Sequence, residues 1–210
     1  MEGQPGNHPQ PNIKDSVALP IHILGQGSEL FRLHESCYGA IYFNPNPSWR
    51  FNDPTGKEYG VLYAALDYQA ALRETLKPKK FNILSSNFLR SRCLSTLTPK
   101  RDLRLVDLEG AGLTRIGADG RLTTGSYQIA QAWSQALYRH PDRVDGLYYC
   151  SRYDPSKLCV ALYEHRVKIS DLEEQRVTAD NLLDLAFDSE LQGFLDRYGY
   201  ERDDVEDPSI

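Results

Sequence analysis

Residues 60–78 constrain the fold of this chain most strongly, because they predict a strand, a turn and a helix with clear boundaries. Residues 60–65 (GVLYAA) are short and apolar, which is typical of a buried strand. Asp67 can cap a following helix, since its carboxylate can accept a hydrogen bond from the first helical turn. We expect this helix to run to Lys77, where Pro78 stops it. The segment therefore predicts a strand leading into a helix that carries Glu74 in its last turn.

The remaining expected elements mix strands and helices in an irregular order. A helix capped by Thr124 is expected to end at Arg139, with Trp133 on its apolar face. Residues 44–56 hold three prolines and three asparagines and predict a structured loop, and the glycines between 110 and 120 indicate turns. Further strands are expected at residues 29–34, 103–108, 146–151 and 158–163. This order favours an α+β fold over a doubly wound α/β sheet.

The chain length of 210 residues fits one domain. Residues 1–14 are rich in Gly, Pro, Asn and Gln, so we expect a flexible N-terminus followed by one domain over residues 15–210. The chain is expected to end in an acidic helical tail from about residue 179, and the charges of residues 201–207 (ERDDVED) are expected to be solvated.

Composition excludes several classes of function. The net charge of −5 argues against direct binding of nucleic acid, which favours a basic face. No apolar run is long enough for a membrane span, and the N-terminus has no secretion signal, so a cytoplasmic location is expected. The four cysteines have no CxxC or histidine pattern, so no metal site is expected. The segment GQGSEL lacks the third glycine of a dinucleotide-binding fingerprint.

Glu74 is the first candidate for a chemical role, because its position conflicts with local rules. It follows the small apolar residues Ala70 and Ala71, which are expected to turn inward. It also lies in the last turn of the helix, where the helix dipole disfavours a carboxylate. The alternative is a surface glutamate paired with Lys77. Helical geometry alone does not separate these two interpretations.

Four other residues could act with Glu74. Arg32 lies in an apolar strand (LFRL), where a buried charge is costly without a ligand or a carboxylate. Arg50 stands between two aromatic residues that could fix its guanidinium group. Tyr63 lies in the middle of GVLYAA, and Ser151 follows a strand without the GxSxG pattern of a serine hydrolase. Each also has an ordinary structural interpretation: a surface arginine, a core tyrosine or a strand-end serine.

Taken in order, these segments resemble the RES domain family over roughly residues 29–166. The segments that carry the resemblance are FRLH with Arg32, RFNDP with Arg50, GVLYAALDYQAALRE with Tyr63 and Glu74, LRLVDLEGAGLTRIG, and DGLYYCSRYD with Ser151. The resemblance implies a fold similar to that of ADP-ribosyltransferase toxins, with mixed, mainly antiparallel sheets and flanking helices. It also implies a toxin that degrades NAD+, and a cognate antitoxin, often with a helix-turn-helix region, that covers the active site.

The resemblance also implies a role for each residue. Catalysis would fall to Arg32 and Glu74, with the carboxylate stabilising the oxocarbenium-like state as the nicotinamide–ribose bond breaks. Arg32 and Arg50 would hold the pyrophosphate, or inorganic phosphate as a co-substrate, because guanidinium groups grip phosphate in bidentate fashion. Tyr63 would stack on nicotinamide, and Ser151 would hydrogen-bond the ribose or carboxamide. NAD+ would be the substrate, and no cofactor or metal is expected.

The sequence leaves three alternatives open. The same site could break the bond by phosphorolysis or by hydrolysis. It could instead transfer ADP-ribose to a protein or nucleic acid, or the chain could be a non-catalytic binding module on the same fold. A monomer and a homodimer are both compatible with the sequence.

Overall fold

The computed structural model describes residues 11, 13, 18–77 and 82–203. The N-terminal segment expected to be flexible, residues 1–14, lies almost entirely outside the described residues. Pro78, expected to stop the first helix, and residues 204–207 of the acidic tail also lie outside them.

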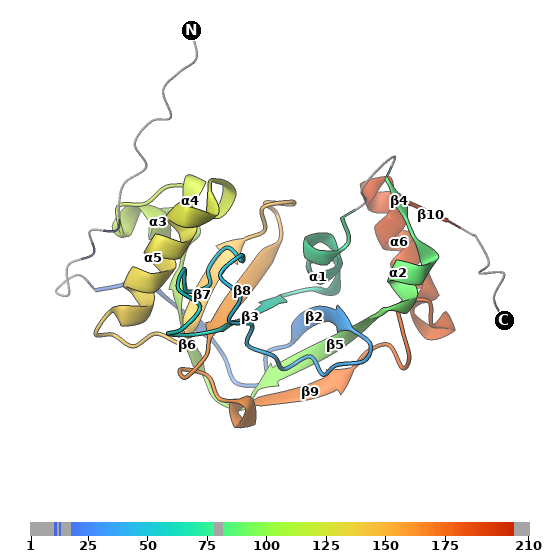
Figure 1. Cartoon of the computed structure of the whole chain (residues 1–210), viewed down its shortest axis with the longest axis horizontal. Coiled ribbons are helices and arrows are strands. Elements are labelled where there is room, and N and C mark those ends of the chain that lie inside the picture. The colour runs from blue at the N-terminus through green and yellow to red at the C-terminus, as the bar shows by residue number, and fades with distance from the viewer. Residues whose placement is uncertain (1–10, 12, 14–17, 78–81, 204–210) are drawn as a thin grey trace, which may run out of the picture.

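The fold is built on one curved sheet of eight strands in the order β1-β6-β7-β8-β3-β2-β5-β9 (Figure 1). All neighbouring strands are antiparallel except β6 and β7, which are parallel. This arrangement confirms the predicted α+β class with a mainly antiparallel sheet. The strands are β1 Ile21–Leu24, β2 Leu30–Glu35, β3 Val61–Ala65, β5 Arg92–Pro99, β6 Leu103–Asp107, β7 Gly146–Cys150, β8 Leu158–Tyr163 and β9 Leu172–Arg176.

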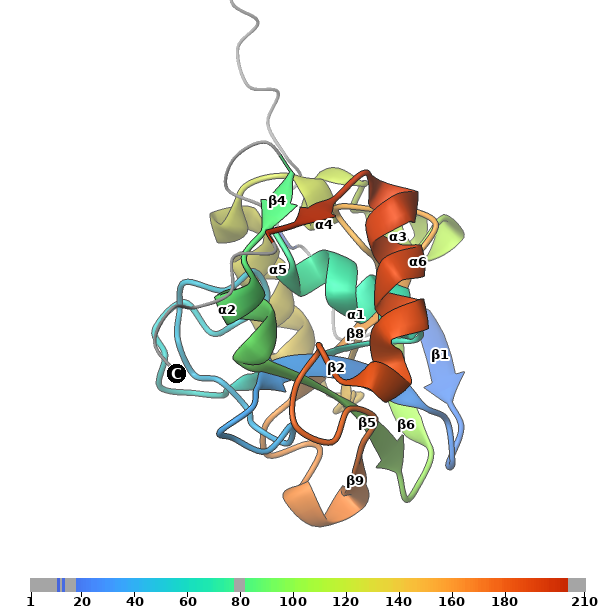
Figure 2. The ribbon, with the colours of Figure 1, turned by 90° about the vertical axis from the view of Figure 1, so that its right-hand side faces the viewer.

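The helices cover two parts of the sheet. Figure 1 shows α3, α4 and α5 gathered near β6–β8, α2 and α6 at the opposite end, and α1 between these two groups. Seen from the side, α6 stands near α1 and close to a small second sheet of two parallel strands, β4 and β10 (Figure 2). These elements are α1 Tyr68–Thr75, β4 Ile83–Leu84, α2 Ser86–Arg90, α3 Ala111–Arg115, α4 Arg121–Thr124, α5 Tyr127–Arg139, α6 Asp188–Tyr198 and β10 Glu201–Arg202, with 3-10 turns at Ile169–Asp171 and Leu185–Phe187. Among the described residues, no helix is both long and apolar enough to cross a membrane.

The predicted strand–helix unit is present, with one boundary changed. The side chain of Asp67 accepts a hydrogen bond from the backbone N–H of Ala70 at 2.8 Å, which confirms the predicted cap. Ala70 and Ala71 are buried, as expected. The helix ends at Thr75 rather than Lys77, because Leu76 already has an extended backbone and its N–H closes the last turn on Leu72.

Other boundaries differ from the prediction for local reasons. Thr124 ends α4 instead of capping α5, whose N-cap is Ser126. The glycine-rich region forms the short helix α3, which lies so close to β6 that a Cβ on Gly112 would come within 2.2 Å of the Asp107 carbonyl oxygen. Helix α6 begins at Asp188, not near residue 179, because the side chains of Asn181 and Asp184 accept backbone hydrogen bonds and hold the preceding residues in turns.

We predict that Asp67→Ala lowers the free energy of unfolding by about 1 kcal/mol, because one N–H of α1 loses its acceptor. Asp67 also forms an ion pair with Lys157 at 3.1 Å, which Asp67→Asn removes while keeping a capping oxygen. The asparagine variant is therefore expected to stay within about 0.5 kcal/mol of the parent chain. Urea unfolding of the three proteins measures both effects. Equal stability of the alanine and asparagine variants would contradict this account of the cap.

Candidate active site

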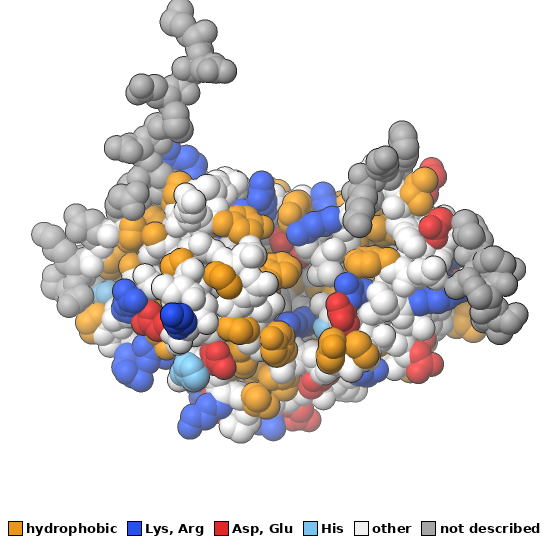
Figure 3. Space-filling view, viewed as in Figure 1, with side chains coloured by type: hydrophobic (Ala, Val, Ile, Leu, Met, Phe, Trp, Pro, Cys, Tyr) orange, Lys and Arg blue, Asp and Glu red, His pale blue; other side chains and the backbone are white. Residues whose placement is uncertain are grey.

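A cavity of about 220 Å³ opens between α1, β2, β3, the end of β7 and the start of α5. In the space-filling view the surface is hollowed between the α3–α5 side and the α2–α6 side, and Lys and Arg side chains gather there (Figure 3). Four of the five predicted site residues line the cavity: Arg32, Arg50, Tyr63 and Glu74. The wall also includes Trp49, Thr75, Lys77, Thr123, Tyr127, Tyr149, Arg152, Tyr153 and Cys159.

The sheet register brings Glu74 and Ser151 together although they are far apart in sequence. Strands β3 and β8 are antiparallel, so Ala65 at the end of β3 lies opposite Cys159 near the start of β8. Helix α1 follows β3, and the turn at residues 151–157 precedes β8, so both occupy the same edge of the sheet. The Ser151 hydroxyl then donates a hydrogen bond of 2.5 Å to Oε1 of Glu74.

Ser151 lies behind Glu74 rather than in the cavity wall, and it is 2% exposed. Its oxygen accepts hydrogen bonds from the backbone N–H groups of Tyr153 at 3.1 Å and Asp154 at 3.2 Å. Its own N–H closes the turn on the carbonyl of Lys157 at 2.7 Å. The hydroxyl proton is therefore directed at Glu74, and Ser151 orients the carboxylate in the free protein.

Glu74 does not form the surface ion pair that was the structural alternative. The Lys77 ammonium lies instead 4.5 Å from the centre of the Tyr153 ring. Glu74 and Lys77, both among the described residues, form no ion pair with each other. Among the described residues no hydrogen-bond donor reaches the second carboxylate oxygen, Oε2. Glu74 thus presents one oxygen held by Ser151 and one available in the cavity.

Tyr63 contributes a ring face to the cavity. Its hydroxyl donates to Oδ1 of Asn52 and accepts from the N–H of Phe51, both at 2.8 Å. Burial raises the pKa of this phenol well above its usual value, so it stays neutral. The Trp49 ring lies 6.3 Å away at a tilt of 40°, and the two rings form an aromatic wall.

Arg50 lies at the opposite wall and is 8% exposed. Its Nη1 donates to the carbonyl of Gly125 at 3.0 Å, and its guanidinium stands 4.5 Å over the ring of Tyr127. Its Nη2 is buried and has no hydrogen-bond partner among the described residues. Burial lowers the pKa of Arg50, and the nearby charge of Arg152 lowers it further. An unpaired buried donor of this kind suits an anionic ligand.

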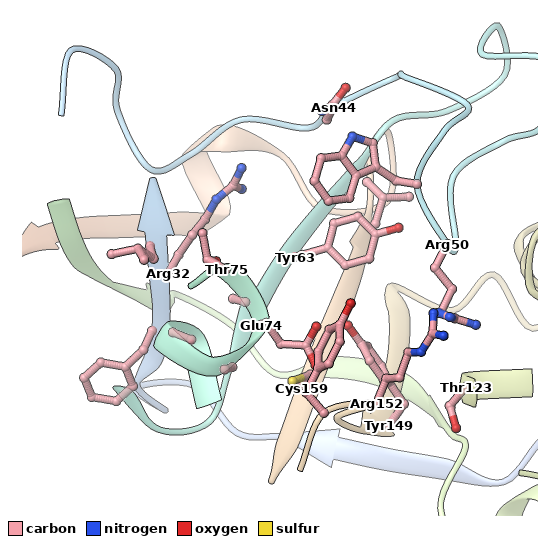
Figure 4. Close-up of a pocket in the computed structure, with 18 of the residues that line it drawn as sticks. Arg32, Asn44, Arg50, Tyr63, Glu74, Thr75, Thr123, Tyr149, Arg152 and Cys159 are labelled. Atoms are coloured by element: carbon pink, nitrogen blue, oxygen red, sulfur yellow. The ribbon is translucent and has the colours of Figure 1, made fainter. Parts of the chain in front are cut away.

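Arg32 is not next to Arg50. Figure 4 shows Arg32 on one side of Glu74, and Arg50 with Arg152 on the other. Arg32 donates to the carbonyl of Tyr42 at 3.0 Å. Burial lowers its pKa to about 10, although the charge of Glu174 partly compensates. The carboxylate of Glu174 therefore offsets part of the free energy that burying the Arg32 charge in β2 costs.

The sequence interpretation missed two residues with clear positions in the site. Arg152 lies beside Arg50 on the same side of Glu74 (Figure 4), is exposed, and has no hydrogen bond to another described residue. Tyr149 is 7% exposed and packs edge-on against Phe51 at 4.9 Å. Both lie within two residues of Ser151. Strand alternation could have pointed to Tyr149, which is in phase with Ser151, whereas Arg152 follows the end of β7 and carries no such signal.

The described residues contain no group of three or more His, Cys, Asp or Glu side chains that could hold a metal ion. The cavity instead offers four cationic side chains, Arg32, Arg50, Lys77 and Arg152, around the single carboxylate of Glu74. This composition is suited to an organic ligand that carries phosphate groups.

Comparison with known families shows which family the chain matches. The RES domain model matches residues 29–191, which is most of the chain. The chain belongs to the RES domain family. The match includes all five predicted site residues of this RES domain and ends within α6.

A solved structure has a similar fold. It is the crystal structure of the M. tuberculosis MbcT–MbcA toxin–antitoxin complex, and one of its chains superposes with a TM-score of 0.57 at 15% sequence identity. The similarity covers 74% of this RES domain protein and 87% of that chain. No curated protein sequence matches.

We predict that inorganic phosphate stabilises this RES domain through Arg50. At a phosphate concentration ten times its dissociation constant the gain is about 1.4 kcal/mol, which raises Tm by about 3–5 °C for a chain of this size. Arg50→Met should abolish the shift. Arg92→Met is the matched control, since Arg92 is a partly buried arginine of β5 outside the cavity. Thermal melts in phosphate, compared with chloride at the same ionic strength, measure the shift in Tm. An Arg50→Met variant that shows the same phosphate-dependent shift as the parent chain would contradict the assignment.

Proposed function

We propose that this protein is a toxin enzyme that cleaves the nicotinamide–ribose bond of NAD+ and is neutralised by a cognate antitoxin. Membership of the RES domain family and the likeness to a chain of a toxin–antitoxin complex support the class. The observation that carries the proposal is the geometry of Glu74, which is fixed by Ser151 between an aromatic wall and a pair of arginines.

The carboxylate supplies the central electrostatic contribution. Loss of nicotinamide leaves positive charge on the ribose in an oxocarbenium-like transition state. A carboxylate held in advance stabilises that charge without having to reorganise during the reaction. Oε1 of Glu74 is fixed by the Ser151 hydroxyl, so Oε2 is the oxygen directed at the ribose. Nicotinamide is already cationic in NAD+ and leaves as a neutral ring, so the proposed reaction needs no metal or cofactor.

The aromatic wall fits the nicotinamide end of the substrate. The ring of Tyr63 offers a stacking face while its hydroxyl is occupied by Asn52 and Phe51, and Trp49 closes the corner. The cavity of about 220 Å³ is smaller than the ~300–1,000 Å³ typical of sites that enclose a drug-sized ligand. In the proposal it holds the nicotinamide riboside end, and the adenosine end lies on the open surface.

The arginines divide the phosphate contacts. Arg50 and Arg152 lie on the same side of Glu74 and would hold the pyrophosphate, or a free phosphate that attacks the ribose. Arg32 approaches from the other side of Glu74, where it can act on the ribose or on the incoming nucleophile. This differs from a shared grip by Arg32 and Arg50, because those two side chains lie on opposite sides of the carboxylate.

The partner in this proposal is an antitoxin that binds over the cavity. The printed description of the similar structure, a toxin–antitoxin complex, supports such a partner. Tyr42 and Trp49 are 55% and 48% exposed near the cavity, and exposed aromatic residues favour a protein interface. The proposal also includes a cytoplasmic location and an antitoxin of the helix-turn-helix type. It is compatible with a monomer and with a homodimer.

The purified protein is expected to consume NAD+, and Glu74→Gln to lower kcat at least about 100-fold because the charge that stabilises the transition state is lost. Glu109→Gln, which neutralises an exposed carboxylate outside the cavity, is the control and should keep full activity. Products are resolved by mass with and without phosphate: ADP-ribose-1-phosphate indicates phosphorolysis, and ADP-ribose indicates hydrolysis.

Intact NAD+ in both reactions, with folded protein, would overturn the proposal. Label from NAD+ appearing on a protein or nucleic acid would instead support ADP-ribosyl transfer by the same site. If the folded protein neither consumes NAD+ nor transfers ADP-ribose, the result would favour the non-catalytic binding module.

Expression of the parent chain in a bacterium is expected to arrest growth as NAD+ falls, whereas Glu74→Gln should not. Co-expression of the adjacent gene, if it encodes the antitoxin, should restore growth and yield a complex in which NAD+ turnover is blocked. Cellular NAD+ and growth are measured together with protein abundance. Growth arrest that persists in the Glu74 variant at equal abundance would show that toxicity does not depend on this site.

A further inference from the structure

A second polar network begins next to Glu74 on the same helix. The Nη1 of Arg73 donates to the hydroxyl of Tyr200 at 2.7 Å. Its guanidinium carbon lies 5.2 Å, 5.4 Å and 5.7 Å from the ring centres of Tyr153, Tyr198 and Tyr200. Tyr153 belongs to the β7–β8 turn, Tyr198 ends α6, and Tyr200 follows that helix, so Arg73 joins both segments to α1.

Tyr198 extends this network to the turn that carries Ser151. Its hydroxyl donates to Oδ2 of Asp154 at 2.7 Å. Oδ1 of Asp154 accepts from the backbone N–H and the hydroxyl of Ser156, at 3.1 Å and 2.6 Å. Hydrogen bonds from Ser156 and Tyr198 hold the pKa of Asp154 at about 2, so it is ionised at neutral pH.

The hydrogen bonds are continuous from α6 to the carboxylate of the site. Tyr198 donates to the Asp154 side chain, the Asp154 N–H donates to the Ser151 hydroxyl oxygen, and that hydroxyl donates to Glu74. Figure 2 shows α6 standing near α1, and Phe194 on its inner face is fully buried. A packed helix therefore holds the far end of the network.

The RES domain match ends at residue 191, before Tyr198 and Tyr200. The C-terminal support is consequently a feature of this chain that lies beyond the matched segment. The turn at residues 151–157 is also held by its own hydrogen bonds, by the ion pair between Lys157 and Asp67, and by its contacts with α1. The hydrogen bond from Tyr198 adds the support from α6.

We propose that Tyr198 is a positioning residue for Glu74, acting through Asp154 and Ser151. The proposal rests on the function proposed above, in which Glu74 stabilises the reacting ribose. A fixed Asp154 holds its backbone N–H against Ser151, which keeps the serine hydroxyl aligned with Oε1. Removing the tyrosine hydroxyl frees the turn and lets the carboxylate drift from its productive position. Small misplacements of catalytic groups have large effects on rate.

Tyr198→Phe tests this, because the ring remains beside Arg73 and only the hydroxyl is lost. We expect kcat for NAD+ cleavage to fall roughly tenfold or more, with KM changed less than about twofold. Gln192→Ala is the matched control: the Gln192 side chain donates to Asp196 on the exposed face of the same helix, away from the turn. That variant should keep the parent kcat. A Tyr198→Phe enzyme with the parent kcat would overturn the proposal.

The double variant Tyr198→Phe/Asp154→Ala determines whether the hydroxyl acts through Asp154. We expect it to be no slower than Asp154→Ala alone, because Asp154→Ala already removes the oxygen that accepts from Tyr198. Multiplicative losses would overturn the route through Asp154.

Amide hydrogen exchange, read by NMR, tests the link without relying on activity. In Tyr198→Phe the amides of Tyr153 and Asp154, which donate to Ser151, are expected to exchange about tenfold faster or more, while core amides of β8 keep their rates. If the parent chain leaves NAD+ intact, the proposed function fails and the exchange result alone decides whether Tyr198 holds the turn. Unchanged exchange at both amides would overturn the inference even in an active enzyme.

Discussion

The hydrogen bond from Ser151 to Glu74 joins two segments that the sheet brings to one edge. Strand β3 runs into α1 at the place where β8 begins, so the helix and the β7–β8 turn must pack against each other. The turn is closed by Ser151 and Lys157, and Lys157 also pairs with the cap residue Asp67. One end of α1 is thus tied to the turn through Asp67 and the other through Glu74. The orientation of the carboxylate follows from how this short helix is fixed at both ends.

The cavity concentrates positive charge in a protein whose net charge is −5. Holding Arg50 nearly buried with an unpaired Nη2 costs free energy, and the proximity of Arg152 adds repulsion. Local rules of stability are broken at both residues, and such violations tend to occur where a ligand supplies the missing partner. A phosphate group would satisfy the buried donor and separate the two guanidinium charges. The same interactions that cost free energy in the protein alone would favour the binding of an anion.

Much of the fold could be predicted because the decisive signals were local. The cap at Asp67, the apolar strand before it and the apolar face around Trp133 all follow from short-range spacing. Strand β5 was missed because its sequence, RCLSTLTP, alternates weakly, with Ser95 and Thr96 buried beside apolar neighbours. Strand β9 (LEEQR) is polar and gains its structure from pairing with β5. Strands β5 and β9 are both fixed by pairing with strands that are distant in the sequence. The spacing of residues along one strand does not reveal that pairing.

The site shows the same division between local and long-range information. Local spacing left Arg32, Arg50, Tyr63 and Glu74 open to ordinary interpretations, and the resemblance to the RES family selected them. The fold brings all four to one cavity. Which arginines lie together could not be found from local spacing, because Arg152, beside Arg50 in the cavity, comes from the β7–β8 turn far along the chain. Tyr198 is further still from any local signal: the role proposed for it rests on its hydrogen bond to Asp154, 44 positions away, and on the burial of α6. The residues that line the cavity stand out in the sequence through local conflicts, whereas the residues that hold them in place have ordinary side chains and are recognisable only from their contacts.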